Sequence, residues 1–280
     1  MIDAPAAAIA RFRTMHETGC FVLPNPWDVG TALYLQHLGF QALATTSAGV
    51  AFSRGMPDTV AAIPRDVMLD HIREVAAATA LPVNADFQNG YADDPEAVAA
   101  NVTLCIGTGA AGLSIEDASG GVTSPLYDFR LAVARVRAAR EAIDASGIPV
   151  VLTARCEAWL VGEPDAERVA IERLVAFAEA GADCLYAPGV RDPRQIAAIV
   201  KAVAPKPVNV LVSAPSPDLS VARLTDLGVR RISVGSALAR VAWGAFIRAA
   251  RTIAATGTFE TLADATPFAE LDALMSGRPH

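Results

Sequence analysis

The clearest indication of the fold is the run LPVNADFQNGYADDPEA, residues 81–97. It begins with an apolar segment that ends on a single acid, Asp86, and then turns through Asn89-Gly90. Asp94-Pro95 follows, which is typical of a helix start because Asp caps the first turn and Pro fits within it. The run therefore predicts a buried strand, a carboxylate at its carboxyl end, and then a helix.

The same alternation of a short apolar segment with a longer helical pattern recurs along the chain. Eight segments predict strands, at residues 21–28, 41–49, 82–87, 112–117, 149–157, 184–188, 207–212 and 231–235. They are apolar almost throughout, as parallel strands buried on both faces require. Eight strands, each followed by a helix, predict an α/β fold, the (β/α)8 TIM barrel. A doubly wound open sheet is the alternative, but no G-x-G-x-x-G or P-loop sequence follows the first strand.

The length and composition suit a single domain. The chain has 280 residues, of which 52% are hydrophobic, and no linker rich in Ser, Gly or Pro divides it. Residues 1–280 are expected to form one barrel domain. Within it, residues 256–280 are expected to form a C-terminal helical extension, packed outside the barrel or on a neighbouring subunit.

Charge and cysteine usage argue against several classes of protein. The net charge of −7, from 23 basic and 30 acidic residues, argues against nucleic acid and anionic membranes as partners. The N-terminus carries acids and arginines, unlike a signal peptide, and no run approaches the roughly 18 uncharged apolar residues that span a bilayer. The four cysteines lie far apart without a C-x-x-C pair, which is typical of reduced thiols in a cytosolic protein. A cytoplasmic location is expected.

Polar residues gather where the predicted strands end, and a barrel carries its chemistry there. They are Asp28, Thr46, Ser47, Asp86, Gln88, Glu116, Asp117, Arg155, Glu157 and Asn209. A buried strand is not stabilised by a terminal acid unless positive charge meets it. Two interpretations stay open: mutual pairing, for example of Arg155 with Glu116, or a bound divalent cation. Carboxylates outnumber basic groups here, which favours the cation.

Oxygen ligands of this kind suit Mg²⁺, with Mn²⁺ as an alternative. Asp86 is the predicted direct ligand, and Glu116 is the predicted second or water-mediated ligand. Gln88 shares a face with Asp86 because side chains alternate along a strand. Its amide oxygen can therefore meet a metal-bound water, although it adds no charge.

The residues that several other types of catalysis require do not occur at the predicted strand ends. The only two lysines, Lys201 and Lys206, lie in the sixth predicted helix or the loop after it, which argues against a Schiff-base aldolase. The four histidines lie away from the strand ends, so a His-rich zinc site is not predicted. Cys156 follows Arg155 but points to the other side of its strand, which favours a structural thiol over a nucleophile.

Six segments of the chain match a known family, in order and spacing. They are LPNPWD, TTSAGVAFSRGMPD, NADFQNGYADDPE, GAAGLSIEDASG, LTARCEAWL and GADCLYAPG. Over roughly residues 18–255 the chain resembles the isocitrate lyase/phosphoenolpyruvate mutase superfamily. The resemblance implies a (β/α)8 barrel, a dimer or tetramer that swaps its last helix, and Mg²⁺ that binds 2-oxo acids.

The resemblance also implies roles for individual residues. Asp86 corresponds to the metal-facing acid, and Glu116 to the acid that holds the ion through water. Asp58 corresponds to a further acid of that network, and Arg155 to the arginine that contacts the substrate's carboxylate or oxyanion. Ser47-Ala48-Gly49 corresponds to the turn whose hydroxyl and N–H groups hold a carboxylate.

The chain departs from the superfamily pattern at two places. Gln88 stands where an Asp or Glu is usual. The loop after the fourth strand, DASGGVTSPLYDFR at residues 117–130, has neither the cysteine of the lyases nor the lysine of the mutases. These departures argue against isocitrate or methylisocitrate lyase activity and weaken the case for a mutase.

The expected function is a Mg²⁺-dependent lyase or decarboxylase that cleaves a bond to C3 of a small 2-oxo or 2-hydroxy acid. The metal and Arg155 would stabilise the enolate, and Asn209 is a further candidate to bind the substrate. Alternatives are phosphonopyruvate hydrolase or phosphoenolpyruvate mutase, and a non-catalytic barrel that binds 2-oxo acids. An unrelated phosphate-binding barrel, using the helix start at Gly235-Ser236, is a further alternative.

Overall fold

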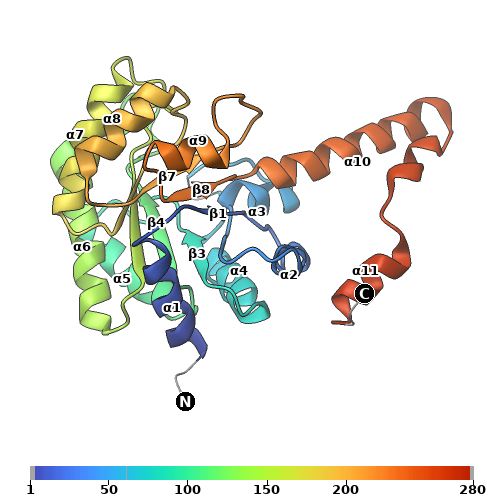
Figure 1. Ribbon diagram of the computed structural model, residues 1–280, viewed down its shortest axis with the longest axis horizontal. Coiled ribbons are helices and arrows are strands. Elements are labelled where there is room, and N and C mark those ends of the chain that lie inside the picture. The colour runs from blue at the N-terminus through green and yellow to red at the C-terminus, as the bar shows by residue number, and fades with distance from the viewer. Residues whose placement is uncertain (1–3, 61, 278–280) are drawn as a thin grey trace.

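A computed structural model describes residues 4–60 and 62–277 of the protein (Figure 1). Eight parallel strands form one sheet in the order β1-β8-β7-β6-β5-β4-β3-β2, which confirms the predicted barrel. The strands are β1 Phe21–Leu23, β2 Leu43–Ala44, β3 Val83–Asp86, β4 Gly112–Glu116, β5 Val151–Arg155, β6 Cys184–Tyr186, β7 Val208–Leu211 and β8 Arg231–Ser233. Between β1 and β2, Ala44 N donates to Pro24 O at 3.0 Å, and this bond nearly closes the sheet into a barrel.

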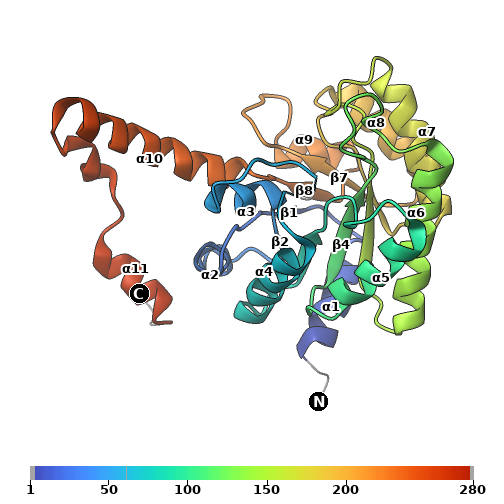
Figure 2. The same ribbon diagram turned by 180° about the vertical axis from the view of Figure 1, so that it is seen from behind.

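Helices surround the strands, as Figures 1 and 2 show from opposite sides. They are α1 Ala4–Met15, α2 Val29–His37, α3 Ser47–Ser53, α4 Arg65–Ala78, α5 Pro95–Ile106, α6 Phe129–Ser146, α7 Ala166–Glu179, α8 Pro193–Val203, α9 Val221–Asp226, α10 Ala237–Thr256, the 3-10 helix η1 Glu260–Asp264 and α11 Phe268–Met275. None of these described helices is long and apolar enough to cross a membrane.

Capping side chains decide where several helices begin. Asp94 Oδ1 accepts hydrogen bonds from the N–H groups of Glu96 and Ala97, which confirms the predicted helix start. The predicted strand at 41–49 is wrong after Ala44. Thr46 Oγ1 accepts from Gly49 N at 3.2 Å and caps α3, so the chain turns into a helix where a strand was expected.

Helix α1 covers the amino end of the barrel. Arg11 Nη2 donates to Gln41 O just before β2, and Arg13 Nη1 donates to Pro149 O just before β5. The ring of Phe12 is fully buried under the sheet, close to Gly112 at the start of β4. Helix α1 therefore covers the amino end of the barrel, opposite the carboxyl ends of the strands.

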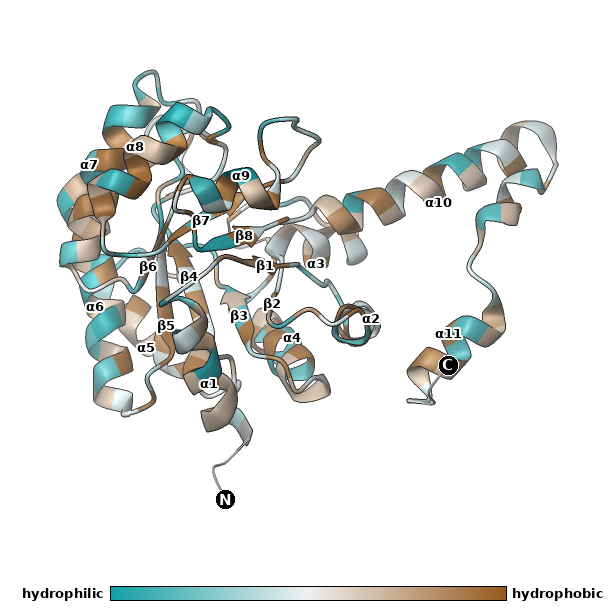
Figure 3. Cartoon of the chain, in the orientation of Figure 1, coloured by the Kyte–Doolittle hydropathy of each residue, from teal (hydrophilic) through white to brown (hydrophobic). Residues whose placement is uncertain are grey.

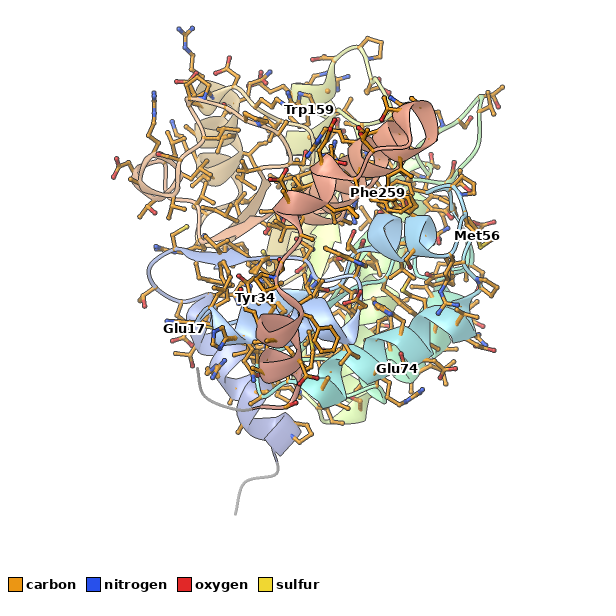
Figure 4. The ribbon with its side chains drawn as sticks, turned by 90° about the vertical axis from the view of Figure 1, so that its right-hand side faces the viewer. Glu17, Tyr34, Met56, Glu74, Trp159 and Phe259 are labelled. Atoms are coloured by element: carbon orange, nitrogen blue, oxygen red, sulfur yellow. The ribbon has the colours of Figure 1, made fainter. Side chains whose placement is uncertain are left out.

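The C-terminal part of the chain forms an arm, defined here as residues 237–277. Helix α10 leaves the barrel on one side, and the chain then turns back through η1 to α11 (Figure 1). Helix α11 approaches α2, with Tyr34 beside it (Figure 4), and the two helices line a hollow of about 610 Å³. Helices η1 and α11 lie within residues 256–280, the range expected for the helical extension, and α10 before them is the helix that follows β8.

The arm exposes many apolar residues, and Figure 3 colours parts of α10 and α11 brown, as hydrophobic. Its exposed large hydrophobic residues are Leu238, Val241, Trp243, Phe246, Ile247, Phe259, Leu262, Phe268, Leu271 and Met275. Phe268 is 84% exposed. So many large apolar side chains on one projecting segment are typical of a surface that another protein chain covers.

Candidate active site

The carboxyl ends of all eight strands surround a cavity of about 170 Å³. Each strand contributes lining residues, among them Leu23, Ala44, Asp86, Ser114, Arg155, Tyr186, Asn209 and Ser233. Of the predicted site residues, the cavity is lined by Ser47, Ala48, Asp58, Asp86, Arg155 and Asn209. Gly49, Gln88 and Glu116 lie outside this lining. The fold therefore brings most of the predicted residues to one place.

Arg155, the last residue of β5, holds three carboxylates together. Its Nη1 lies 2.8 Å from Asp86 Oδ1, its Nη2 lies 3.1 Å from Glu116 Oε2, and its Nε lies 2.9 Å from Glu157 Oε1. Burial alone would lower the pKa of Arg155, but these three acids together hold it well above its ordinary value. The pairing of Arg155 with Glu116 that the sequence left open is present, and it extends to two further acids.

Asp86 is fixed on both of its oxygens. Oδ1 accepts from Arg155, and Oδ2 accepts from the Ser47 N–H and the Ser47 hydroxyl, each at 2.8 Å. The Asp86 N–H donates no ladder bond to β2 but bonds to Thr45 Oγ1 at 2.9 Å. The first turn of α3 and the end of β3 are thereby joined directly at the cavity.

Negative charge exceeds positive charge around this guanidinium. Burial raises the pKa of Glu116 to about 8, even though Arg155 opposes the shift. Burial, and then the charge of Asp86, raises the pKa of the Asp58 carboxyl, and burial also raises that of Glu157. Three carboxyl groups with raised pKa values, together with Asp86, lie around the Arg155 guanidinium, which is an environment that a further cation would stabilise.

The residues fit a hard divalent ion in the kind of donor they offer. Carboxylate oxygens suit Mg²⁺ or Mn²⁺, which usually takes one or two carboxylates and keeps several waters. Among residues 4–60 and 62–277, however, no three Asp, Glu, His or Cys side chains are arranged to hold an ion together. Gln88 Nε2 points toward Thr59 O at 3.5 Å, and its backbone is left-handed at φ 45°. Asp86 and Glu116, both bonded to Arg155, are the carboxylates that could hold an ion, and Gln88 lies outside the cavity lining.

A second set of hydrogen-bonded polar residues lies deeper in the barrel. Arg231 Nε donates to Asn209 Oδ1 at 2.9 Å, and Asn209 Nδ2 donates to Ser233 Oγ at 2.9 Å. Arg231 Nη2 donates to Thr153 Oγ1 at 3.0 Å. Asn209 was predicted to line the site, but its neighbours Arg231 and Ser233 were not.

Asn25 joins three strand ends behind the cavity. Its Oδ1 accepts from the N–H groups of Val234 and Gly235 at 3.0 and 2.8 Å, and its Nδ2 donates to Thr45 O at 2.9 Å. Because the Gly235 N–H is already bonded to Asn25, the start of α10 at Gly235-Ser236 has one donor fewer for an anion. This contact argues against a phosphate site at that segment.

Sequence reasoning missed Glu157, Tyr186, Arg231 and Ser233 as site residues. Each was inside a predicted strand or at its end, and the period-two alternation of strands places all four on the inner face. Glu157 was noted as a polar strand-end residue without a role. Alternation along 184–188 and 231–235 was the available signal for the others.

A family model described as phosphoenolpyruvate phosphomutase matches residues 12–254. The chain belongs to this family. The match confirms the resemblance to the isocitrate lyase/phosphoenolpyruvate mutase superfamily. It spans the barrel and nearly all of α10. The family contains both lyases and mutases, so membership narrows the chemistry without choosing one reaction.

Two solved structures resemble the whole chain. A protein from Burkholderia cenocepacia J2315, described as a candidate lyase/mutase, is 48% identical with a TM-score of 0.93, over 98% of this chain and 97% of that one. Oxaloacetate acetylhydrolase in complex with its product oxalate is 28% identical with a TM-score of 0.86, over 98% and 97%.

Two curated relatives match part of the chain. The 2-methylisocitrate lyase of Escherichia coli (strain K12) is 36% identical over 166 residues, which cover 58% of this chain and 55% of the relative. The oxaloacetate decarboxylase of Rhodopseudomonas palustris (strain BisB18) is 31% identical over 176 residues, which cover 59% and 56%. The named relatives are therefore enzymes of small oxo or hydroxy acids.

Proposed function

We propose that the protein is a Mg²⁺-dependent lyase or decarboxylase, with Mn²⁺ as an alternative ion. It cleaves a bond to C3 of a small 2-oxo or 2-hydroxy acid through an enolate. The observation that carries the proposal is Arg155, one buried guanidinium that faces Asp86, Glu116 and Glu157 in a cavity of about 170 Å³. A volume of this size favours a short acid over a long one.

The guanidinium is the group suited to the developing negative charge. Nη1 of Arg155 pairs with Asp86, and Nη2 pairs with Glu116. These are the two carboxylates proposed to hold the ion. If Asp86 and Glu116 turned to an ion, Nη1 and Nη2 of Arg155 would become available to an anionic oxygen of the substrate. A preorganised donor of this kind stabilises an enolate by about 3 kcal/mol or more.

Other residues of the site have proposed binding roles. The Ser47-Ala48-Gly49 turn at the start of α3 would meet the substrate's carboxylate through the Ala48 N–H, because the N–H groups of Ser47 and Gly49 already donate to Asp86 and Thr46. Asn209 would contact the substrate from β7. Asp58 would be the acid nearest this carboxylate, and its raised pKa limits the repulsion between them. The bound metal would supply Lewis-acid polarisation of the C2 oxygen.

The composition of the loop after β4 favours a reaction that uses no lysine or cysteine from this loop. Residues 117–128 form a short hairpin in which Ser119 N donates to Pro125 O at 2.9 Å, and Val122 at its tip is 99% exposed. The loop contains no Cys, Lys or His. We therefore favour decarboxylation of an oxaloacetate-like acid over isocitrate-type cleavage, in line with the oxaloacetate enzymes among the relatives.

Turnover assays test the proposal directly. Purified protein with Mg²⁺ should convert oxaloacetate, and the activity should be lost with a chelator and fall at least about 100-fold in Arg155→Lys, which keeps the charge but loses the planar donor pair. Failure of the wild-type protein on oxaloacetate, other 2-oxo acids and 2-methylisocitrate would contradict it.

Phosphonopyruvate hydrolase or phosphoenolpyruvate mutase is the second candidate, because the matching family model carries the mutase description. Phosphorus NMR of a reaction with phosphonopyruvate separates the two candidates, since only the second releases or moves phosphorus. A non-catalytic barrel that binds 2-oxo acids is the third candidate. Calorimetry that detects tight binding of a 2-oxo acid without product would favour it.

We further propose a cytoplasmic homo-oligomer, a dimer or tetramer in which the arm packs on a neighbouring subunit. The exposed apolar side chains of α10 and α11 support this assembly. The net charge of −7 supports the absence of nucleic acid and membrane partners.

A further inference from the structure

Tyr186 occupies a central place in the cavity. It is the last residue of β6, paired in register with Arg155 of β5 on one side and Asn209 of β7 on the other. Tyr186 is only 8% exposed, and it lines the cavity together with both neighbours. The guanidinium carbon of Arg155 lies 5.1 Å from the centre of its ring. The phenol is thus held next to the one group proposed to bind the enolate oxygen.

A chain of donors runs from the barrel floor toward the Tyr186 oxygen. Arg231 donates to Asn209, and Asn209 donates to Ser233, both at 2.9 Å. Ser233 lines the cavity together with Tyr186, and because Ser233 Oγ accepts from Asn209, the Ser233 hydroxyl proton is left for an acceptor in the cavity. A phenol whose oxygen receives such a hydrogen bond keeps its own proton available for the substrate.

The charges around the phenol suit a group that gives up a proton briefly. Burial raises the pKa of Tyr186 to about 12, so the phenol is protonated at neutral pH. Arg155 and then Ser233 lower the pKa of Tyr186 and would stabilise the phenolate, while the charges of Glu157 and Asp86 raise this pKa and favour return of the proton. Arg231, only 2% exposed, has neutral partners in Asn209, Thr153 and His16, so its positive charge also acts on the cavity.

We propose that Tyr186 is the proton donor to C3 of the enolate, with Ser233 and Asn209 as positioning residues. This inference rests on the proposed function. Cleavage leaves the electron pair of the broken bond in the enolate. C3 then takes the proton of the Tyr186 hydroxyl as the C2 carbonyl re-forms, and the phenolate recovers a proton from water. Tyr186 would thus supply the proton that the loop after β4 cannot supply, because that loop has no Cys, Lys or His.

Exchange of the product's C3 protons with deuterium tests the inference apart from bond cleavage. Wild-type protein with Mg²⁺ and pyruvate in D2O should exchange the methyl protons, measured by proton NMR. Tyr186→Phe should slow this exchange at least about 100-fold, the usual size of a general-acid contribution. The variant's affinity for oxalate, which needs no proton, should stay within about twofold in calorimetry.

Two further sets of variants give matched comparisons. Tyr91→Phe removes another buried phenol, which has no hydrogen-bond partner and lies outside the cavity lining, so exchange should stay near the wild-type rate. Ser233→Ala should slow the exchange without changing oxalate affinity, and Ser233→Thr, which keeps the hydroxyl, should restore it. A merely structural role of Ser233 would change oxalate affinity as well.

The outcomes separate this inference from the proposed function. Wild-type exchange in Tyr186→Phe would overturn the role of Tyr186. Oxaloacetate turnover by the wild-type protein without any methyl exchange would also overturn it, while the lyase proposal would stand. Absence of both turnover and exchange in the wild-type protein would overturn both.

Discussion

At the scale of single residues, the arrangement of the site depends on the contacts of one long side chain, that of Arg155. The sequence predicted that Asp86, Glu116 and Arg155 end neighbouring strands, because strand ends follow from apolar runs. It left open whether Arg155 pairs with an acid, since a long guanidinium side chain can meet several partners. The structure shows three, and one of them, Glu157, is two residues along the same strand end.

Asp117 provides a prediction at this scale. Its Oδ1 accepts from Glu157 N at 2.8 Å, and its Oδ2 lies 3.1 Å from Arg173 Nη1, with both side chains buried. Asp117→Asn should lower the free energy of unfolding by about 3–5 kcal/mol, because it leaves Arg173 as an unpaired buried charge.

Urea unfolding measures this loss, and Asp165→Asn is the matched control. Asp165 pairs with Arg168 on the surface, where an ion pair contributes about 0.2–1 kcal/mol. Similar losses in the two variants would mean that the buried pair has no special role in stability.

At the scale of elements, α1 was the part that the sequence did not assign to the barrel. It has arginines and alanines without the strong period that identified other helices, and its fit under the sheet depends on tertiary contacts. The predicted strands were also too long, because polar caps such as Thr46 end them sooner than apolar runs suggest. Strand order and helix starts, by contrast, follow from local patterns that the fold preserves.

His16, just after α1, gives a pH-dependent prediction. Its Nδ1 lies 2.7 Å from Phe12 O and its Nε2 lies 3.3 Å from Arg231 Nη1, so the ring must be neutral to accept from Arg231. Burial, and then the charge of Arg231, lowers the pKa of His16 to about 3. The unfolded chain then binds a proton below about pH 6.5 that the folded chain does not bind, so stability falls as pH drops from about 6.5 toward 3.

The variant His16→Gln, which cannot be protonated, should remove this contribution. The difference in free energy of unfolding between wild type and variant should change by up to about 1.4 kcal/mol per pH unit between pH 6 and 4. Urea titrations at several pH values measure it. A constant difference across this range would show that His16 does not take up a proton on unfolding.

At the scale of the whole molecule, the arm was only partly predictable. The sequence indicated a helical extension over residues 256–280, after the helix that follows the eighth strand. In the structure, α10 already projects from the barrel with large apolar residues exposed, and η1 and α11 follow it (Figure 1). Which surface covers those residues depends on a second chain, and a single sequence does not encode that arrangement in any local pattern.

Light scattering tests the assembly. The wild-type protein should have the mass of a dimer or tetramer, and the double variant Phe246→Glu/Phe268→Glu should have the mass of a monomer, because each charge would be buried in the interface. Val122→Glu, at an exposed position on the barrel loop, should keep the wild-type mass. A wild-type monomer at all concentrations would contradict the proposed oligomer.

The most direct test of the account is a calorimetric titration with oxalate, a mimic of the enolate, in the presence and absence of Mg²⁺. The account predicts that oxalate binds the wild-type protein at least about 100-fold more tightly with Mg²⁺, and that Asp86→Asn removes this difference. Equal oxalate affinity with and without Mg²⁺, in a protein that is folded in both conditions, would contradict the central claim that Asp86 and Arg155 act together around a divalent ion.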